Sequence, residues 1–242
     1  MRKNSDIKEV KKNRVAIVRE RVKTSSYIGV WWFALVLVHA AEPPLLNISV
    51  DISDKAALQR GAKLFMNYCS GCHSLRYLRY NRMAHDLGLT TFDGSIDADL
   101  LKSNLIFTQA TIHDPIQISM PEVDARQWFG RLPPDLSLTA RERGVSWVYT
   151  FLNSFYADST RSFGANNRLV PNVGMPNVIV PLREDSQMTQ QQLEASIKDL
   201  VTFLSYVAEP FKIERQRMGW VVLPFLCLCL GVVGLLKTKW RS

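Results

Sequence analysis

Cysteine and histidine are both scarce in this chain, which has only four of each among its 242 residues. Cys227 and Cys229 lie in an uncharged apolar run near the C-terminus, where we expect them to be small packing residues. Only Cys69 and Cys72 lie outside that run, and this number and spacing exclude a disulfide framework. Internal repeats and low-complexity tracts are also lacking. The length suits one well-packed domain of roughly 150–200 residues with accessory segments.

Positive charge is in excess, but it is confined to the two ends of the chain. The formal net charge is +8, to which residues 1–24 contribute +6 and residues 237–242 contribute +3, so the residues between them carry −1. A basic protein ordinarily suggests a nucleic-acid partner. Here each basic segment borders an apolar run, which indicates membrane topology instead. We therefore expect a membrane protein with no nucleic-acid partner.

The first apolar run lies within residues 25–44, and its apolar centre, residues 27–38, is shorter than the ~20 residues that span a bilayer. A basic segment precedes this run, and residues small enough for a cleavage site end it. These features are typical of a secretory signal peptide. We predict a signal peptide over residues 1–40, cut near Ala40; an uncleaved N-terminal anchor is the alternative.

The second apolar run, residues 218–236, has no charged residue and is long enough to cross the hydrocarbon core at ~1.5 Å per residue. Trp220 and Trp240 lie near its ends, as aromatic residues do at membrane interfaces. We predict a transmembrane anchor over residues 218–236. The exported domain would then comprise residues 41–217, and residues 237–242 would form a cytoplasmic tail.

The exported domain is predicted to be mainly helical. Apolar residues recur at helical spacing from about Ser53, the expected cap, to Cys69, and Asp54 favours the positive end of this helix. Gly61 falls inside the helix, where glycine costs about 1 kcal/mol relative to alanine. A second helix that crosses closely over Gly61 would explain why glycine is there.

The candidate for the crossing helix is residues 189–210, which begins with a capping box at Thr189 and carries an apolar stripe. A third helix is expected over residues 145–156. The stretches of about 80–140 and 157–188 are rich in Pro, Gly, Asn and Asp and are predicted to be mostly loop. Loops this long usually bind or wrap something, and a large planar cofactor would supply the core that short helices lack.

The segment YCSGCH places Cys69, Cys72 and His73 in a Cys-x-x-Cys-His motif. This motif is the attachment signature of c-type haem, in which both thiols form thioethers with the porphyrin and the histidine binds the iron. A zinc knuckle would need a second Cys or Cys/His pair, and none occurs outside the membrane run. A thioredoxin-like redox pair would need a βαβ setting. We therefore predict one covalently attached haem c.

The sixth ligand of the iron can be a methionine thioether or a second histidine. Met175 is the best candidate, because prolines stiffen its loop and Gly174 permits close approach to the ring. Met120, which also precedes a proline, is the runner-up. His85 and His113 are interpreted as ordinary loop histidines.

Arg141 and Arg143 are candidates for binding the haem propionates, because partly buried carboxylates need cationic partners. Both lie in LPPDLSLTARERG, between a proline pair and an aromatic helix. A solvated surface charge is the alternative role for each of them.

Several segments resemble the cytochrome c1 family, and they occur in the same order as in that family. They are DKAALQRGAKLFMNYCSGCHSLRYLRYNRM, LPPDLSLTARERG, NVGMPNV and VTFLSYVAEP, followed by a single C-terminal anchor. The resemblance covers almost the whole predicted mature chain. It implies a mainly α fold: a class I cytochrome c-like helical domain with long haem-wrapping loops, plus one C-terminal transmembrane helix.

The resemblance also implies roles for individual residues. It implies that Cys69 and Cys72 form the thioether links, that His73 is the proximal iron ligand and that Met175 is the distal one. It implies that Arg143, in preference to Arg141, binds a propionate and that Pro133 and Pro134 form part of the haem wall. It also implies that Leu200 and Phe203 pack over Gly61. Long insertions and internal disulfides found in some members are absent here, as in a compact bacterial member.

Cytochrome c1 is the haem subunit of the ubiquinol–cytochrome c oxidoreductase, the cytochrome bc1 complex. The resemblance implies that this chain takes electrons from a Rieske iron–sulfur protein and passes them to a cytochrome c. It implies cytochrome b as a neighbour, a dimeric complex, and a bacterial inner-membrane location with the haem domain in the periplasm. The chain would belong to an enzyme yet carry no acid–base catalytic residue of its own.

Two further interpretations concern partners and alternative functions. Asp93, Asp97 and Asp99 would attract a basic cytochrome c, with a solvated loop as the alternative. A membrane-tethered haem sensor with an open iron site, or the haem subunit of another oxidase complex, is the alternative function. Carbon monoxide distinguishes a sensor, because it binds rapidly only where the sixth position is open.

Overall fold

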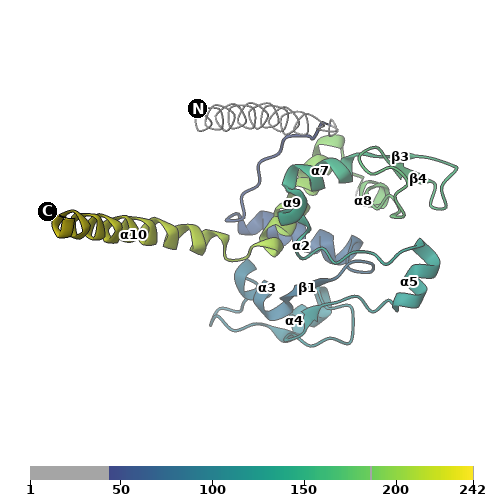
Figure 1. Ribbon diagram of the computed structural model, residues 1–242. Coiled ribbons are helices and arrows are strands. Elements are labelled where there is room, and N and C mark those ends of the chain that lie inside the picture. Colours follow the sequence, from purple (N-terminus) through teal and green to yellow (C-terminus); the bar gives the residue numbers. More distant parts are fainter. Residues whose placement is uncertain (1–43, 186, 242) are drawn as a thin grey trace, which may run out of the picture. The chain divides into compact units, whose positions relative to one another are not determined.

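Helices dominate the computed structural model, which describes residues 44–185 and 187–241 (Figure 1). The predicted signal peptide lies outside these residues. The elements in chain order are α2 (Lys55–Tyr68), β1 (Leu75–Arg79), α3 (Tyr80–Leu87), α4 (Ala98–Asn104), β2 (Pro115–Ile116), α5 (Glu122–Phe129), α6 (Thr139–Arg143), α7 (Val145–Asn153), β3 (Phe155–Ala157), β4 (Ala165–Asn167), α8 (Ile179–Asp185), α9 (Gln190–Ala208) and α10 (Lys212–Arg241). The mainly helical class expected from the sequence is confirmed.

Helices α2 and α9 cross in the middle of the domain, with α3, α4 and β1 on one side of the pair and α7, α8, β3 and β4 on the other (Figure 1). The apolar core follows from this crossing, because its members come mainly from α2, α3, β1 and α9. The strands form two small antiparallel sheets, in which β1 pairs with β2 and β3 pairs with β4.

The crossing is centred on Gly61, as the sequence predicts. A Cβ atom at Gly61 would lie 2.2 Å from the Asp199 carbonyl oxygen and 2.7 Å from Phe203 Cβ, which is too close for any side chain. Phe203 also packs against Phe65, with 5.9 Å between ring centroids. Arg60 Nε lies 2.6 Å from the Asp199 carboxylate at the rim of the contact. Glycine therefore lets the two backbones touch and bury apolar side chains on both sides.

The ends of the two helices are capped by polar side chains. Thr189 and Gln192 form the predicted capping box of α9. At α2 the cap is Asp54, whose carboxylate accepts from the Ala57 N–H at 3.0 Å, so the expectation that Ser53 caps the helix is wrong. Ser53 instead donates its hydroxyl to the carboxylate of Asp51. A carboxylate is the stronger acceptor at the positive end of a helix dipole.

The third helix is shorter than the predicted range 145–156. It ends at Asn153, and Phe155 begins a strand because Tyr156 and its neighbours pair with residues 165–167. The aromatic face is nevertheless continuous, with ring centroids 5.3 Å apart for Trp147 and Phe151 and 5.2 Å apart for Phe151 and Phe155. Aromatic spacing alone does not distinguish these two backbone conformations.

The stretches predicted to be mostly loop contain short helices, so that part of the prediction is partly wrong. Helices α3 to α6 and α8 each have five to eight residues, too few for a clear apolar period. Gly88 and Gly130 end α3 and α5 with φ of 71° in both cases, a conformation that glycine adopts at low cost.

The C-terminal helix α10 includes the predicted anchor, residues 218–236, and extends beyond it at both ends. It has a mean hydropathy of 2.4 over its most apolar window and is the one helix of the described chain that is long and apolar enough to cross a membrane. Arg82 of α3 lies 4.3 Å above the ring of Phe211, directly before α10. This cation–π contact joins α3 to the segment that leads into the anchor.

Candidate haem-attachment site

The Cys-x-x-Cys-His motif forms a tight turn at the C-terminal end of α2. Cys69 is the residue that caps α2, and its N–H donates to the Phe65 carbonyl at 2.9 Å. The Cys69 carbonyl then accepts from the N–H groups of Cys72 at 3.0 Å and His73 at 2.8 Å. The motif therefore forms one hydrogen-bonded turn directly after α2, and both cysteines are free thiols on that turn.

The local environment of the thiols does not match a redox pair. Burial, with a smaller contribution from Cys72, raises the pKa of the Cys69 thiol to about 12, and burial also raises the pKa of Cys72. Redox-active Cys-x-x-Cys pairs have a lowered pKa and lie in a βαβ fold, whereas the sheets described here are antiparallel pairs. Across residues 44–185 and 187–241, no group of three His, Cys, Asp or Glu side chains converges to hold a metal ion.

His73 is oriented by a main-chain carbonyl. Its side chain is buried, and Nδ1 lies 2.7 Å from the Pro134 carbonyl oxygen. Because a carbonyl only accepts, Nδ1 carries the proton and the lone pair is on Nε2. Burial lowers the pKa of His73, although the Pro134 bond and the charge of Asp135 oppose this shift. No residue of the described chain hydrogen-bonds to Nε2, so the imidazole is neutral and free to bind iron.

The segment with Pro134 is bonded along its length to the chain that follows His73. Residues 134–137 run beside residues 73–77, and the bonds between them use both main-chain and side-chain atoms. They are Leu136 N to Ser74 O at 2.9 Å, Arg76 N to Asp135 Oδ2 at 2.9 Å, and Tyr77 N to Ser137 Oγ at 3.1 Å. This network fixes the carbonyl that orients His73. The contribution of Asp135 and Ser137 was not predicted from the sequence.

The structure separates the methionines into two groups. Met66 and Met83 are buried in the apolar core, and the sulfur of Met188 lies 3.6 Å from the Ser196 hydroxyl. Met120 and Met175 are half-buried and do not belong to that core. Among the methionines between α2 and α9, only Met120 and Met175 have no packing role in the core, and these are the two considered from the sequence as iron ligands. Met175 remains the preferred one as a prediction.

The Met175 loop is held against the end of α5. A Cβ atom at Gly174 would lie 2.9 Å from the Phe129 carbonyl oxygen, so the close approach inferred for Gly174 is made to a backbone. Asn172 has a φ of 64° and donates its N–H to the Asn166 side chain at 2.9 Å. None of residues 168–178 is fully buried. The loop is therefore positioned from one side, and its other side is available to a large ligand.

Two buried asparagines organise this loop, and sequence analysis missed both. Asn167 accepts the N–H groups of Leu169 and Val170 and donates to the Phe151 carbonyl at 2.7 Å. Asn166 makes the bond to Asn172 and also donates to Asp158. The pair Asn-Asn in a proline-rich stretch was the available signal, because asparagine side chains replace backbone partners in irregular segments.

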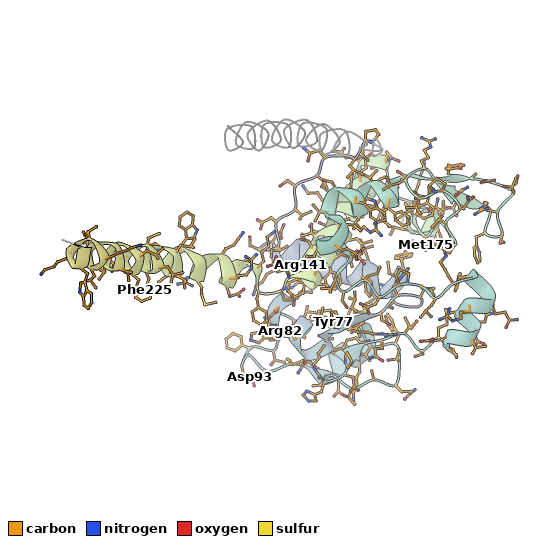
Figure 2. All side chains as sticks on the ribbon, in the orientation of Figure 1. Tyr77, Arg82, Asp93, Arg141, Met175 and Phe225 are labelled. Carbon is orange, nitrogen blue, oxygen red and sulfur yellow. The ribbon has the colours of Figure 1, made fainter. Side chains whose placement is uncertain are left out.

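The proposed propionate partners lie on α6, which follows the Pro134 segment. The guanidinium of Arg143 lies 5.4 Å from the ring centroid of Trp147, and its nearest carboxylate is that of Glu142 at 3.9 Å. Arg141 is exposed and lies centrally in the view of Figure 2. Neither arginine makes a close ion pair in the described chain, so both remain candidates for binding an anion.

The other polar candidates have local partners. His113 is exposed and pairs with Asn81, whereas His85 lies in α3 rather than in a loop and its Nδ1 is 3.3 Å from Asp86. Among the acidic residues, hydrogen bonds from Thr91 and then Ser95 lower the pKa of Asp93 to about 2. Asp97 caps α4. Figure 2 shows Asp93 and Met175 far apart in the domain.

Comparison with known proteins identifies the family of this chain. The family described as the Cytochrome C1 family matches residues 47–242, which includes the thiol turn, the Pro134 segment, the Met175 loop and α10. This chain belongs to the cytochrome c1 family. The resemblance recognised in the sequence is confirmed, and membership implies a covalent haem c and electron transport.

Individual relatives support the assignment. Cytochrome c1 of Allochromatium vinosum is 42% identical over 82% of this chain and 89% of that protein. A protein named ammonia monooxygenase gamma subunit, from Nitrosomonas europaea, is 36% identical over 83% of this chain and 89% of its own length. Cytochrome b/c1 of Bradyrhizobium diazoefficiens is 25% identical over 77% of this chain but only 33% of that longer protein.

Proposed function

We propose that this cytochrome c1 carries one covalent haem c and passes electrons from a Rieske iron–sulfur protein to a cytochrome c within a bc1 complex. The observation that supports this most is the state of His73. Its ring is buried and neutral, its Nδ1 proton is bound by Pro134, and its Nε2 faces no protein partner in the described chain. That combination suits an axial iron ligand next to two free thiols.

Each residue has a distinct part in holding the haem. Cys69 and Cys72 provide the sulfur atoms of the two thioethers at the end of α2. His73 would bind the iron through Nε2, and Met175 would bind it through its thioether sulfur. Arg143 and Arg141 bind the propionates, and Pro134 fixes the imidazole through its carbonyl. When bound, the haem supplies one-electron chemistry between Fe(II) and Fe(III).

The protein has no proton to move in this reaction, so its residues act by positioning and by polarity. Methionine ligation raises the reduction potential relative to a second histidine. The bonds from residues 134–137 to residues 74–77 hold the proximal ligand in one orientation. An imidazole held in this way would keep nearly the same position in both oxidation states of the iron. The reorganisation energy of the site would therefore be small.

The anchor and the relatives support the wider assembly. Helix α10 is long and apolar enough to serve as a membrane anchor, which supports a membrane location. The expected location is a bacterial inner membrane, with the haem domain in the periplasm and the signal peptide removed. Cytochrome b is the expected neighbour, because one relative has a name that joins cytochrome b and c1. A dimeric complex with cytochrome b and a Rieske protein follows as the expected form.

A second candidate function comes from the Nitrosomonas europaea relative, which is named as an ammonia monooxygenase subunit. Membrane solubilisation in mild detergent, followed by purification through a tag on the full chain, distinguishes the two. Recovery of a b-type cytochrome and a Rieske protein supports the bc1 assignment. Recovery of an oxygenase without these subunits would support the second candidate.

A sensor function is tested on the same purified protein. If Met175 occupies the sixth position, the reduced protein binds carbon monoxide slowly and incompletely. Rapid, complete binding would show an open iron site and contradict the assignment of Met175.

A further inference from the structure

A cavity of about 410 Å³ opens beside the Met175 loop, between the end of α5 and the turn at residues 160–163. Gly174 lines it, whereas Cys69, Cys72, His73 and Met175 do not. The cavity is therefore distinct from the residues that would hold the iron, yet it adjoins the proposed distal ligand by one residue.

Two arginines line this cavity and no carboxylate does. Arg131 Nε lies 4.0 Å from the position of a Cβ atom at Gly174. Arg161 is held in a turn, in which its N–H donates to Asp158 and its carbonyl accepts from Gly164. Throughout the residues that the structure describes, neither guanidinium is within 4.0 Å of a carboxylate oxygen.

One carboxylate outside the cavity lining, that of Asp158, interacts electrostatically with Arg161 and remains ionised. The Asp158 carboxylate accepts from the Thr160 hydroxyl at 2.6 Å and from the Asn166 amide at 3.0 Å. Those hydrogen bonds lower the pKa of Asp158 more than the charge of Arg161 does. The lining of the cavity itself is positive, because it contains two guanidinium groups and no carboxylate, and Asp158 opposes only the charge of Arg161 from outside the lining.

Three aromatic residues, Trp128, Phe129 and Phe163, line the same cavity as the two arginines. The rings of Phe129 and Phe163 pack with 5.5 Å between centroids, and Trp128 is 58% exposed. Exposed aromatic residues beside arginine are the usual anchors of protein interfaces. We name Trp128, Phe129, Arg131, Arg161 and Phe163 the arginine surface.

We propose that the arginine surface docks an electron acceptor whose contact face is negatively charged. The proposal rests on the proposed function and specifies the chemistry of the acceptor. Charge complementarity is its basis, since the lining of the cavity beside the Met175 loop is positive and the acidic Asp93 is remote from Met175 (Figure 2). On docking, one electron leaves Fe(II), which becomes Fe(III), and the acceptor is reduced by one electron.

The test uses the full chain with its haem, in detergent, and two small oxidants of opposite charge. Each oxidant, ferricyanide or tris(phenanthroline)cobalt(III), removes one electron from the reduced protein. We expect the rate with the anion ferricyanide to fall as salt is added and the rate with the cobalt cation to rise. The double variant Arg131→Gln, Arg161→Gln should be oxidised by ferricyanide about three- to tenfold more slowly than the unaltered protein at low ionic strength. At high salt the two rates should be equal.

The matched control is Lys102→Gln with Lys198→Gln, which removes the same charge from exposed positions on α4 and α9. It should leave the rate within about twofold, because screening limits the reach of remote charges. A ferricyanide rate that rises with salt, or equal effects in both double variants, would overturn the proposal. So would a shift in midpoint potential or a changed haem spectrum in the arginine variant, because the arginines would then act on the haem itself.

A protein acceptor completes the test. A basic cytochrome c and the same protein with succinylated lysines differ mainly in the sign of their charge. The arginine surface predicts faster transfer to the succinylated form at low salt, and faster transfer to the basic form would contradict it. A chain without covalent haem would give no oxidation in any of these assays, which is failure of the proposed function and not of the docking site.

Discussion

The α2–α9 crossing and the loops that carry Pro134 and Met175 are held by different forces. The crossing is stabilised by apolar side chains packed around a backbone contact at Gly61. The loops contribute few buried apolar residues and are held by hydrogen bonds from side chains such as Asp135 and Asn167 to backbone groups. The helix pair is thus complete by itself, whereas the loops have one side organised for a ligand that is not protein.

The largest effect is expected when the crossing is broken at Gly61. In Gly61→Val the added carbons would meet the Asp199 backbone, which cannot move without displacing α9, so the loss should be at least about 3 kcal/mol. Thermal unfolding of the haem-loaded protein measures it. Gly219→Val, in α10, is the matched control, because a Cβ there meets nothing within 4 Å, and equal losses in the two variants would contradict this interpretation of the crossing.

The next largest effect should come from the loop side, at Asn167. Asn167→Ala removes the bonds that shape residues 169 and 170 and leaves the Phe151 carbonyl without its partner, at a cost of about 2 kcal/mol. The red absorption band that reports a methionine–iron bond should weaken as well. Asn104→Ala, on the exposed face of α4, should change neither quantity, and an intact band in Asn167→Ala would separate Met175 from this asparagine.

A smaller effect is expected inside the helical region. Tyr206 donates its hydroxyl to the Asp86 carboxylate at 2.8 Å, and Arg82 binds the same carboxylate. Tyr206→Phe keeps the packing and removes one bond, so we expect a loss of about 1 kcal/mol. Chemical denaturation measures it, and the methionine–iron band should not change. A change in the band would show that the two regions are not independent.

The smallest effect concerns the acidic cluster. The double variant Asp93→Asn, Asp99→Asn should leave the salt dependence of electron transfer unchanged, because Asp93 is remote from Met175 (Figure 2) and is occupied by its own turn. Stopped-flow oxidation by a basic cytochrome c at several ionic strengths is the measurement. A flatter salt dependence in the variant would restore the cluster as a docking site.

The two regions were also predictable to different degrees. The helical period and Gly61 indicated the α2–α9 crossing, because a regular element repeats its signal over several turns. The boundaries were less predictable: Asp54 rather than Ser53 caps α2, and Phe155 belongs to a strand. Short helices such as α4 and α5 give too few turns for a period.

The residues of the candidate site were also predictable from the sequence to different degrees. The motif at Cys69, Cys72 and His73 is local in sequence, so its chemistry was evident from spacing. The carbonyl of Pro134 lies 61 residues from its partner His73, and a main-chain atom leaves no residue-type signal. The roles of Asn166 and Asn167 also depend on partners brought together only by the fold.

The most direct test of the central claim is extraction of the denatured protein with acidified organic solvent, followed by a pyridine haemochrome spectrum. If Cys69 and Cys72 each form a thioether, all the haem remains with the polypeptide and its spectrum is that of a porphyrin with no free vinyl group. In Cys69→Ala with Cys72→Ala the colour should leave with the solvent or be absent. Extraction of haem from the unaltered protein would contradict the account.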